Sequence, residues 1–144
     1  MNLKISFLVK LLNIILLSSF AGCGFENENA EVKWSGNSQQ FDKEFSFSQN
    51  LEAENILTRK VDGHPFSGSL FLSSGGTRSE QTYSMGKLTG TSIKKNNDGS
   101  YVEANFHNGE LHGEMKFYDS SKNLRSTIVY ENGKLIPASK DGFK

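Results

Sequence analysis

One short pattern recurs three times in the second half of the chain, and it limits the possible folds more than any other feature. The glycines in "SMGKL", "HNGEL" and "ENGKL" stand 23 and 24 residues apart. Each has an aromatic residue three positions before it and a leucine two positions after it. Repetition with a period of about 20 to 50 residues is typical of repeat architectures. The repeated residues are Gly86, Gly109 and Gly133, with the aromatics Tyr83, Phe106 and Tyr130 and the leucines Leu88, Leu111 and Leu135.

Each unit of 23 residues holds two turns, which predicts one β-hairpin per unit. The Asn-Gly pairs at 108–109 and 132–133 supply the positive φ angles of a two-residue type I′ turn. We expect Asp-Gly at 98–99 to form the same turn between two main ones. The other intermediate turns are expected at Gly76 and Asn123.

These hairpins predict an all-β fold. One hairpin cannot bury its apolar face alone, so stacked neighbours are expected to share a stripe of the repeated aromatics and leucines. The expected architecture is an elongated single antiparallel β-meander of about three hairpin repeats, preceded by a signal peptide and a polar tether. The expected strands lie near 69–73, 78–84, 91–96, 100–107, 113–119 and 124–131.

The N-terminus has the three parts of a secretory signal peptide. Lys4 and Lys10 precede an apolar run from Leu11 to Leu17, and the small-residue stretch "SSFAG" follows. The apolar run is shorter than the roughly 20 residues that a membrane-spanning helix needs.

The predicted domains are therefore a signal peptide over 1–22, a polar tether over 23–50, a repeat domain over 51–137 and a tail over 138–144. Polar composition favours a flexible tether at its start. Three phenylalanines later in it mark either a strand docked on the domain edge or part of a linker. The segment from Trp34 to Phe47 is expected to cover the second edge of the sheet or part of a face, while Pro137 ends the first edge.

Cys23 is the only cysteine, so no disulfide can form within the chain. "FAGC" resembles the bacterial lipobox, although Phe20 stands where a branched aliphatic residue is usual. The resemblance implies that Cys23 is lipidated and becomes the first mature residue, with palmitate among its acyl chains. Acyl chains contribute about 0.8 kcal/mol per buried methylene, so several hold a domain on a membrane. The alternative is an ordinary cleaved signal peptide with an incidental cysteine.

The same resemblance implies a location. Gly24 is not aspartate, which by resemblance to lipoproteins favours the outer membrane in a double-membraned cell. The expected localisation is an exported, membrane-anchored lipoprotein of the cell envelope. The chain has 16 basic and 16 acidic residues, so no basic bias indicates a nucleic-acid partner.

The repeat itself resembles a known family. "PFSGSLFL", "TYSMGKLTG", "NFHNGELHGEMKFYD" and "LRSTIVYENGKL" are similar to the MORN-repeat-variant family, often labelled YwqK-type antitoxins. The similarity covers about residues 57 to 136. It implies a binding or scaffold module, and the antitoxin label implies a toxin-like protein partner. It supplies no catalytic residues.

The most reactive-looking side chains occupy variable positions of the repeat. His107 and His112 flank the 108–109 turn, but a zinc site needs three or four convergent ligands, so no metal is expected. Glu110 and Glu114 lie near a hairpin tip and are expected to be solvated. No nucleophile-elbow, zinc-protease or phosphate-loop motif occurs. We expect no enzyme activity and no cofactor.

Exposed aromatic residues are better candidates for binding. Strand alternation sends Tyr118 to the face opposite Phe117, and we select Tyr101 and Tyr118 as candidate partner-binding residues, since aromatics dominate interface energetics. The sequence thus predicts a non-catalytic, lipid-anchored module that binds a protein partner, with antitoxin or immunity function as the sharper form. The alternative is a structural, glycan-binding or lipid-binding envelope lipoprotein.

Overall fold

The computed structural model describes residues 32–137. The chain divides into two units, residues 1–30 and 31–144, and all described residues belong to the second. The described elements are β1 (Lys33–Asn37), α1 (Ser38–Glu44), β2 (Phe45–Gln49), β3 (Asn55–Arg59), β4 (Gly68–Ser74), β5 (Thr77–Ser84), β6 (Lys87–Lys95), β7 (Tyr101–His107), β8 (Glu110–Tyr118), β9 (Leu124–Glu131) and β10 (Lys134–Ile136).

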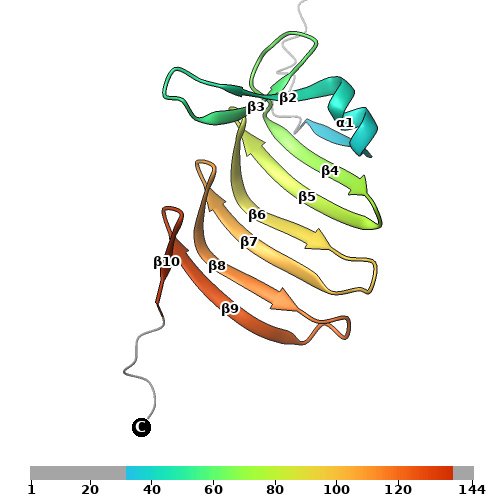
Figure 1. Ribbon diagram of the computed structural model, residues 1–144, viewed down its shortest axis with the longest axis vertical. Coiled ribbons are helices and arrows are strands. Elements are labelled where there is room, and N and C mark those ends of the chain that lie inside the picture. The colour runs from blue at the N-terminus through green and yellow to red at the C-terminus, as the bar shows by residue number, and fades with distance from the viewer. Residues whose placement is uncertain (1–31, 138–144) are drawn as a thin grey trace, which may run out of the picture. The chain divides into compact units, whose positions relative to one another are not determined.

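The predicted all-β fold is confirmed. An eight-stranded main sheet has the order β1-β4-β5-β6-β7-β8-β9-β10, and β4 to β10 form a continuous antiparallel meander (Figure 1). Two features extend the expected single meander. β1 pairs with β4 in parallel, which makes the main sheet mixed, and β2 and β3 form a separate antiparallel hairpin.

The main turns have the backbone conformation that the Asn-Gly pairs predict. A type I′ turn needs positive φ at both central residues, and all three main turns have it, including the one whose first residue is methionine. The values are 50° and 78° at Met85 and Gly86, 51° and 88° at Asn108 and Gly109, and 48° and 74° at Asn132 and Gly133.

The expectation of a type I′ turn at Asp98-Gly99 is wrong. Gly99 has a φ of 86°, but Asp98 is not among the residues with positive φ. A longer loop closes instead, with the Gly99 amide donating to the Asn96 carbonyl at 3.1 Å. The same loop recurs one unit later at Lys122, whose φ is 65°. The left-handed residue of this loop is thus Lys122 and not the expected Asn123, because the sequence pattern does not show which residue takes that conformation.

One backbone hydrogen bond joins each hairpin to the preceding unit. The turn glycine donates its amide to a carbonyl in the unit before it, in the same way each time. The three bonds are Gly86 N to Phe66 O at 2.8 Å, Gly109 N to Leu88 O at 2.8 Å, and Gly133 N to Leu111 O at 2.9 Å. The repeated leucines thus serve the fold through their carbonyls as well as their side chains.

A second glycine of the repeat lies at a β-bulge. Gly90 and Gly113 have φ values of 69° and 99°, and the strand register shifts opposite both of them. The bulge lets β6 and β8 continue past it. Pro137 holds the corresponding place after β10, and proline cannot take a positive φ or donate a ladder hydrogen bond. β10 accordingly ends at Ile136.

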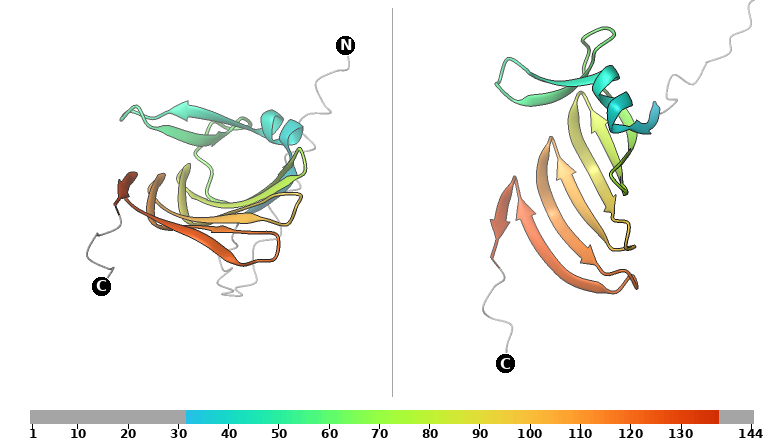
Figure 2. Two further views of the ribbon diagram at one scale, coloured as in Figure 1. Left: turned by 60° about the horizontal axis from the view of Figure 1, so that its bottom comes forward. Right: turned by 45° about the vertical axis from the view of Figure 1, so that its right-hand side comes forward.

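The segment before the repeats folds onto the sheet. β1, which contains Trp34, occupies the edge beside β4, and the β2–β3 hairpin with α1 lies over one face (Figure 2). Figure 2 also shows that the sheet curves toward this covered side. The expectation that residues 34–47 cover an edge or part of a face thus understated their role, since they do both.

The seven-residue α1 was not expected from the sequence. It begins with a capping box, in which the Asn37 side chain accepts from the Gln40 amide and the Gln40 side chain accepts from the Asn37 amide. Phe41 in the helix packs on the rings of Trp34 and Phe45. Caps and tertiary contacts can stabilise a helix too short to form alone. Within residues 32–137, no helix is long and apolar enough to cross a membrane.

The core lies between the β2–β3 hairpin and the N-terminal end of the main sheet. Leu57 and Leu70 are fully buried there. Aromatic rings fill the remaining space in an edge-to-face series in which Phe66 contacts both neighbours. The buried core cluster is Phe45, Leu57, Phe66, Leu70 and Tyr83.

Candidate functional site

The main sheet has two different faces. The face on which the β2–β3 hairpin packs is called the hairpin face, and the other is called the opposite face. Strand register places the repeated residues on the hairpin face, because each aromatic lies directly across from the leucine of its own hairpin. The pairs are Tyr83 with Leu88, Phe106 with Leu111, and Tyr130 with Leu135.

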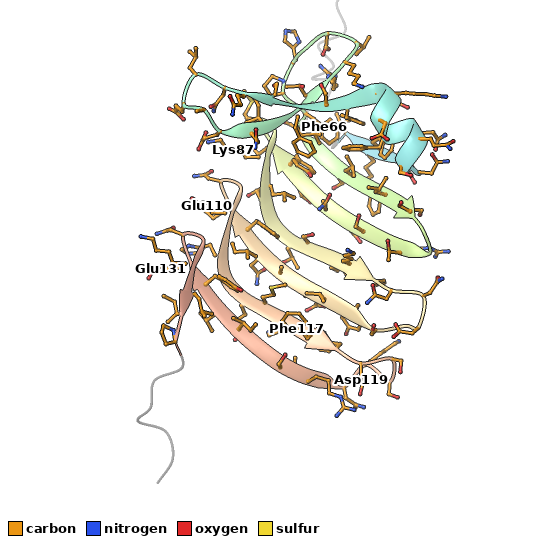
Figure 3. All side chains as sticks on the ribbon, viewed as in Figure 1. Phe66, Lys87, Glu110, Phe117, Asp119 and Glu131 are labelled. Carbon is orange, nitrogen blue, oxygen red and sulfur yellow. The ribbon has the colours of Figure 1, made fainter. Side chains whose placement is uncertain are left out.

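Burial of this stripe changes along the sheet. Tyr83, under the hairpin, is 6% exposed, whereas Leu135 at the far end is 58% exposed. Figure 3 shows Phe66 beneath the hairpin and Phe117 on the part of the sheet that the hairpin does not reach. The cover therefore ends before the apolar stripe does.

The uncovered part of the hairpin face forms what we call the open apolar patch. Its side chains come from β7, β8 and β9 and are partly exposed, although their register follows that of the buried stripe. Val102 lies across from Phe117, and Ala104 across from Met115, which in turn lies across from Ile128. The patch consists of Phe106, Leu111, Met115, Phe117, Ile128 and Tyr130.

Tyr101 and Tyr118, the candidate binding aromatics, lie on the opposite face. They face each other across β7 and β8, and their rings stack with centroids 4.4 Å apart and an interplanar angle of 9°. The Tyr118 hydroxyl donates to Glu103 at 3.4 Å. The two rings thus form one stacked aromatic pair on the opposite face.

The histidines of the 108–109 turn are near each other but form no cluster of ligands. The rings of His107 and His112 are 5.8 Å apart, and His112 Nδ1 lies 3.2 Å from the Asn132 side-chain oxygen. In the part of the chain that the structure describes, no group of three or more potential metal ligands occurs.

Charged side chains line the tips of the main turns. Lys87 forms an ion pair with Glu54 at 2.5 Å. The hydrogen bond with Lys87 lowers the pKa of the Glu54 carboxyl, and the same bond raises the pKa of the Lys87 amine. Both shifts favour the charged forms, which suits surface pairing rather than proton transfer near pH 7.

Glu110 and Glu114 are both exposed, as expected for solvated tip residues. Glu114 forms an ion pair with Lys116 at 2.7 Å. The hydrogen bond that Lys116 donates to the Glu114 carboxylate raises the pKa of Lys116. The ion-pair partner of Glu114 is therefore Lys116.

Comparisons with family models, curated proteins and solved structures found no match to this chain. Cys23, the signal peptide and the start of the tether lie outside the described residues.

Sequence reasoning missed how far the cover extends over the hairpin face. The signals were present in the chain, since "NSQQ" encodes the capping box of α1 and the spacing of Phe45 and Phe47 is that of a strand. What they did not show is where this cover stops. Leu88 on β6 still packs against the core cluster, whereas no residue of β7, β8 or β9 is among those that do, which leaves the open apolar patch.

Proposed function

We propose that this protein is a non-catalytic, lipid-anchored binding module of the cell envelope that binds a protein partner on the open apolar patch. The observation that carries the proposal is the change in burial along one stripe, from the buried Tyr83 to the partly exposed Phe106 and Tyr130. Contiguous exposed apolar surface on a folded protein is typical of protein interaction sites.

The composition of the patch supports the same proposal. Phe106, Phe117 and Tyr130 are residue types that dominate interface energetics, and Met115 adds an adaptable side chain. Polar and charged side chains at the hairpin tips border the patch, as in interfaces with an apolar centre and a polar rim. A sharper form, based on the resemblance to YwqK-type antitoxins, is that the partner is a toxin that the protein neutralises.

Site-specific photo-crosslinking in the native cell tests the patch. A photoreactive residue at position 117 is expected to give one discrete protein adduct, which mass spectrometry identifies. The matched control is position 127, an exposed threonine on β9 whose register places it on the opposite face. Adducts at neither position, or equally at both, would reject the patch as the binding site.

The patch variant Ile128→Asp gives the energetic test. It should weaken the partner by tenfold or more, since truncated hot-spot contacts cost about 2 kcal/mol or more. Thr127→Asp adds the same charge on the other face and is expected to leave binding unchanged. Neutralisation of the partner's toxicity by the wild type alone would support the immunity form.

The anchor is tested separately by metabolic labelling with a palmitate analogue. Wild-type protein is expected to carry the label and to sediment with membranes, and Cys23→Ser to do neither, because a serine hydroxyl does not replace the acylated thiol. An unlabelled wild-type protein would remove the anchor while leaving the patch unaffected.

A further inference from the structure

Two cations lie directly across from each other on the opposite face. Arg78 on β5 pairs in register with Lys95 on β6, and both side chains are exposed. Like charges at directly opposite positions of an antiparallel pair are destabilising. Within residues 32–137, neither cation has an acidic side chain at salt-bridge distance, whereas Arg59, Lys87 and Arg125 do. The sheet therefore keeps an unfavourable pair that an anion would relieve.

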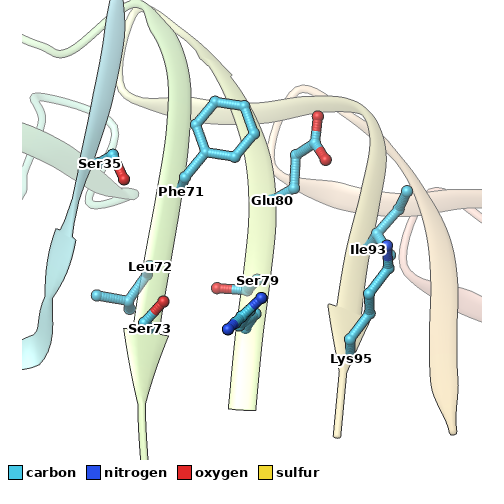
Figure 4. A pocket seen from close by; sticks show the side chains of 9 residues that line it. Ser35, Phe71, Leu72, Ser73, Ser79, Glu80, Ile93 and Lys95 are labelled. Atoms are coloured by element: carbon cyan, nitrogen blue, oxygen red, sulfur yellow. The ribbon is translucent and has the colours of Figure 1, made fainter. Parts of the chain in front are cut away.

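The cation pair lies in a trough that crosses several strands. One cavity of about 340 Å³ is lined by Arg78 and Lys95 together with Phe71, Glu80 and Ile93. Its lining residues come from β1, β4, β5 and β6 (Figure 4). A second cavity of about 280 Å³ shares Ile93 and Lys95 with the first. The two cavities therefore adjoin at these two residues, and together they are called the trough.

The second cavity adds an aromatic wall and a third cation. Tyr101 and Lys122 line it, together with Glu103. Tyr118 stacks on one side of the Tyr101 ring. Lys95 lies directly across from Tyr101 in the register of β6 and β7. The ring of Tyr101 thus belongs to the same row of cross-strand neighbours as Lys95 and Arg78.

We infer that this trough binds an acidic polysaccharide. The fork of Arg78 and the amine of Lys95 can hold a carboxylate or phosphate group through charge-assisted hydrogen bonds. The C–H groups of a sugar ring carry a partial positive charge and suit the negative face of Tyr101. Glu80 and Glu103 can accept hydrogen bonds from sugar hydroxyls.

The same two glutamates distinguish this ligand from nucleic acid. A nucleic-acid strand carries one negative charge about every 3.4 Å, and it would bring phosphates against Glu80 and Glu103, which line the same trough. A polysaccharide with one charge per sugar or per few sugars can place hydroxyls there instead. This site lies on the face away from the open apolar patch and does not depend on it.

The test measures binding of the full chain in detergent micelles to polygalacturonate, using calorimetry. The matched probe is fully methyl-esterified polygalacturonan, which has the same backbone without the charge. We expect binding to the acidic polymer that weakens as salt increases, and no binding to the ester. Equal affinity for both polymers, or equal or tighter binding of single-stranded DNA, would overturn the inference.

Variants locate the site. The double variant Arg78→Gln and Lys95→Gln is expected to lose at least about tenfold in affinity, a difference of about 1.4 kcal/mol. Tyr101→Ala should also weaken binding, while Tyr101→Phe should retain it. The control is Lys94→Gln, because Lys94 lies across from Ser79 and faces the hairpin side.

A loss of polymer binding by the double variant can be distinguished from a loss of folding. Neutralising both members of an opposed like-charge pair should leave the melting temperature of the double variant equal or higher, and photo-crosslinking at position 117 should be unaffected. A double variant that binds the polymer as wild type does would overturn the inference, as would Lys94→Gln having the same effect as the double variant.

Discussion

The main-turn glycines hold a backbone conformation that few other residues tolerate. Gly109 has a φ of 88°, and a side-chain carbon added there would meet only Lys87, at an ordinary contact distance of 3.8 Å. Space is therefore not the constraint at this residue. The constraint is the left-handed backbone, which is most costly for β-branched residues.

Gly109→Val should consequently destabilise the protein by roughly 1 to 3 kcal/mol. Thermal unfolding measures this, at about 4 to 8 °C per kcal/mol for a domain near 100 residues. Asn108→Gly is the matched control and should change stability little, because glycine also accepts positive φ. An unchanged melting temperature for Gly109→Val would contradict the turn assignment.

Residue-scale prediction succeeded where a residue type has one dominant backbone preference. Asn-Gly specifies its turn, so the tips at 108–109 and 132–133 could be placed from the sequence alone. It failed where several loop types share the same letters. Asp98-Gly99 fits both a two-residue turn and the longer loop observed, and Lys122 gives no sign in the sequence that it adopts a φ of 65°.

At the scale of elements, the β2–β3 hairpin acts as the lid of the core. Its Leu57 is fully buried, and its amide donates to the Gly86 carbonyl at 2.8 Å, which ties the hairpin to the first main turn. Leu51, at the tip of the same hairpin, is fully exposed. Leu57 therefore holds the hairpin on the core, whereas the Leu51 side chain remains exposed to solvent.

Leu57→Ala should destabilise by about 2 to 5 kcal/mol, the usual cost of truncating a buried leucine. Leu51→Ala makes the same chemical change at the surface and should stay within about 0.5 kcal/mol of wild type. Urea unfolding followed by circular dichroism measures both. Similar effects for the two variants would mean that the hairpin does not pack as described.

The sequence predicted the periodic strands, but it did not predict the elements that cover the hairpin face, which are α1 and the β2–β3 hairpin. All six expected strands are present, because turn residues bounded them on both sides. β6 and β8 begin earlier than expected, at Lys87 and Glu110, since the glycine bulges allow the strands to continue. α1 carries no helical periodicity, so its seven residues could be recognised only through its cap and its contacts.

At the scale of the whole molecule, stability should depend on a buried tyrosine at high pH. Burial raises the pKa of Tyr83 from 10.0 to about 12. The folded state thus favours the neutral phenol, so its contribution is fully present below about pH 10 and is lost as the pH rises to about 12. The difference corresponds to roughly 2 to 3 kcal/mol.

Urea unfolding at about pH 9 and about pH 11.5 tests this pH dependence. Wild type should lose more stability between the two pH values than Tyr83→Phe, which keeps the ring and has no phenol to ionise. Other tyrosines and the lysines are common to both proteins and cancel in the comparison. Equal losses would show that Tyr83 ionises as readily when folded as when unfolded.

The candidate sites could be predicted only in part, because a face is a property of the whole sheet. Alternation along a strand predicts from the sequence alone that Phe117 and Tyr118 lie on opposite faces. Only the strand register shows that Tyr118 stacks on Tyr101. The opposed pair of Arg78 and Lys95 depends on the two-residue register shift in β6. Gly90 marks the bulge, but a glycine does not show by how many residues the register shifts, so the cation trough was not visible in the sequence.

The hydrogen bond that joins successive hairpins has a consequence for how such a protein can change over time. The turn glycine of each unit donates its amide to a carbonyl of the preceding unit, and the repeated leucine offers its carbonyl to the following unit. Leu135 holds the position of that leucine in the third repeat. Tandem duplication of one unit would therefore create a compatible junction at both of its ends. Length is thus an evolvable property of this architecture, and a single recombination event could widen its surfaces without redesigning any of its parts.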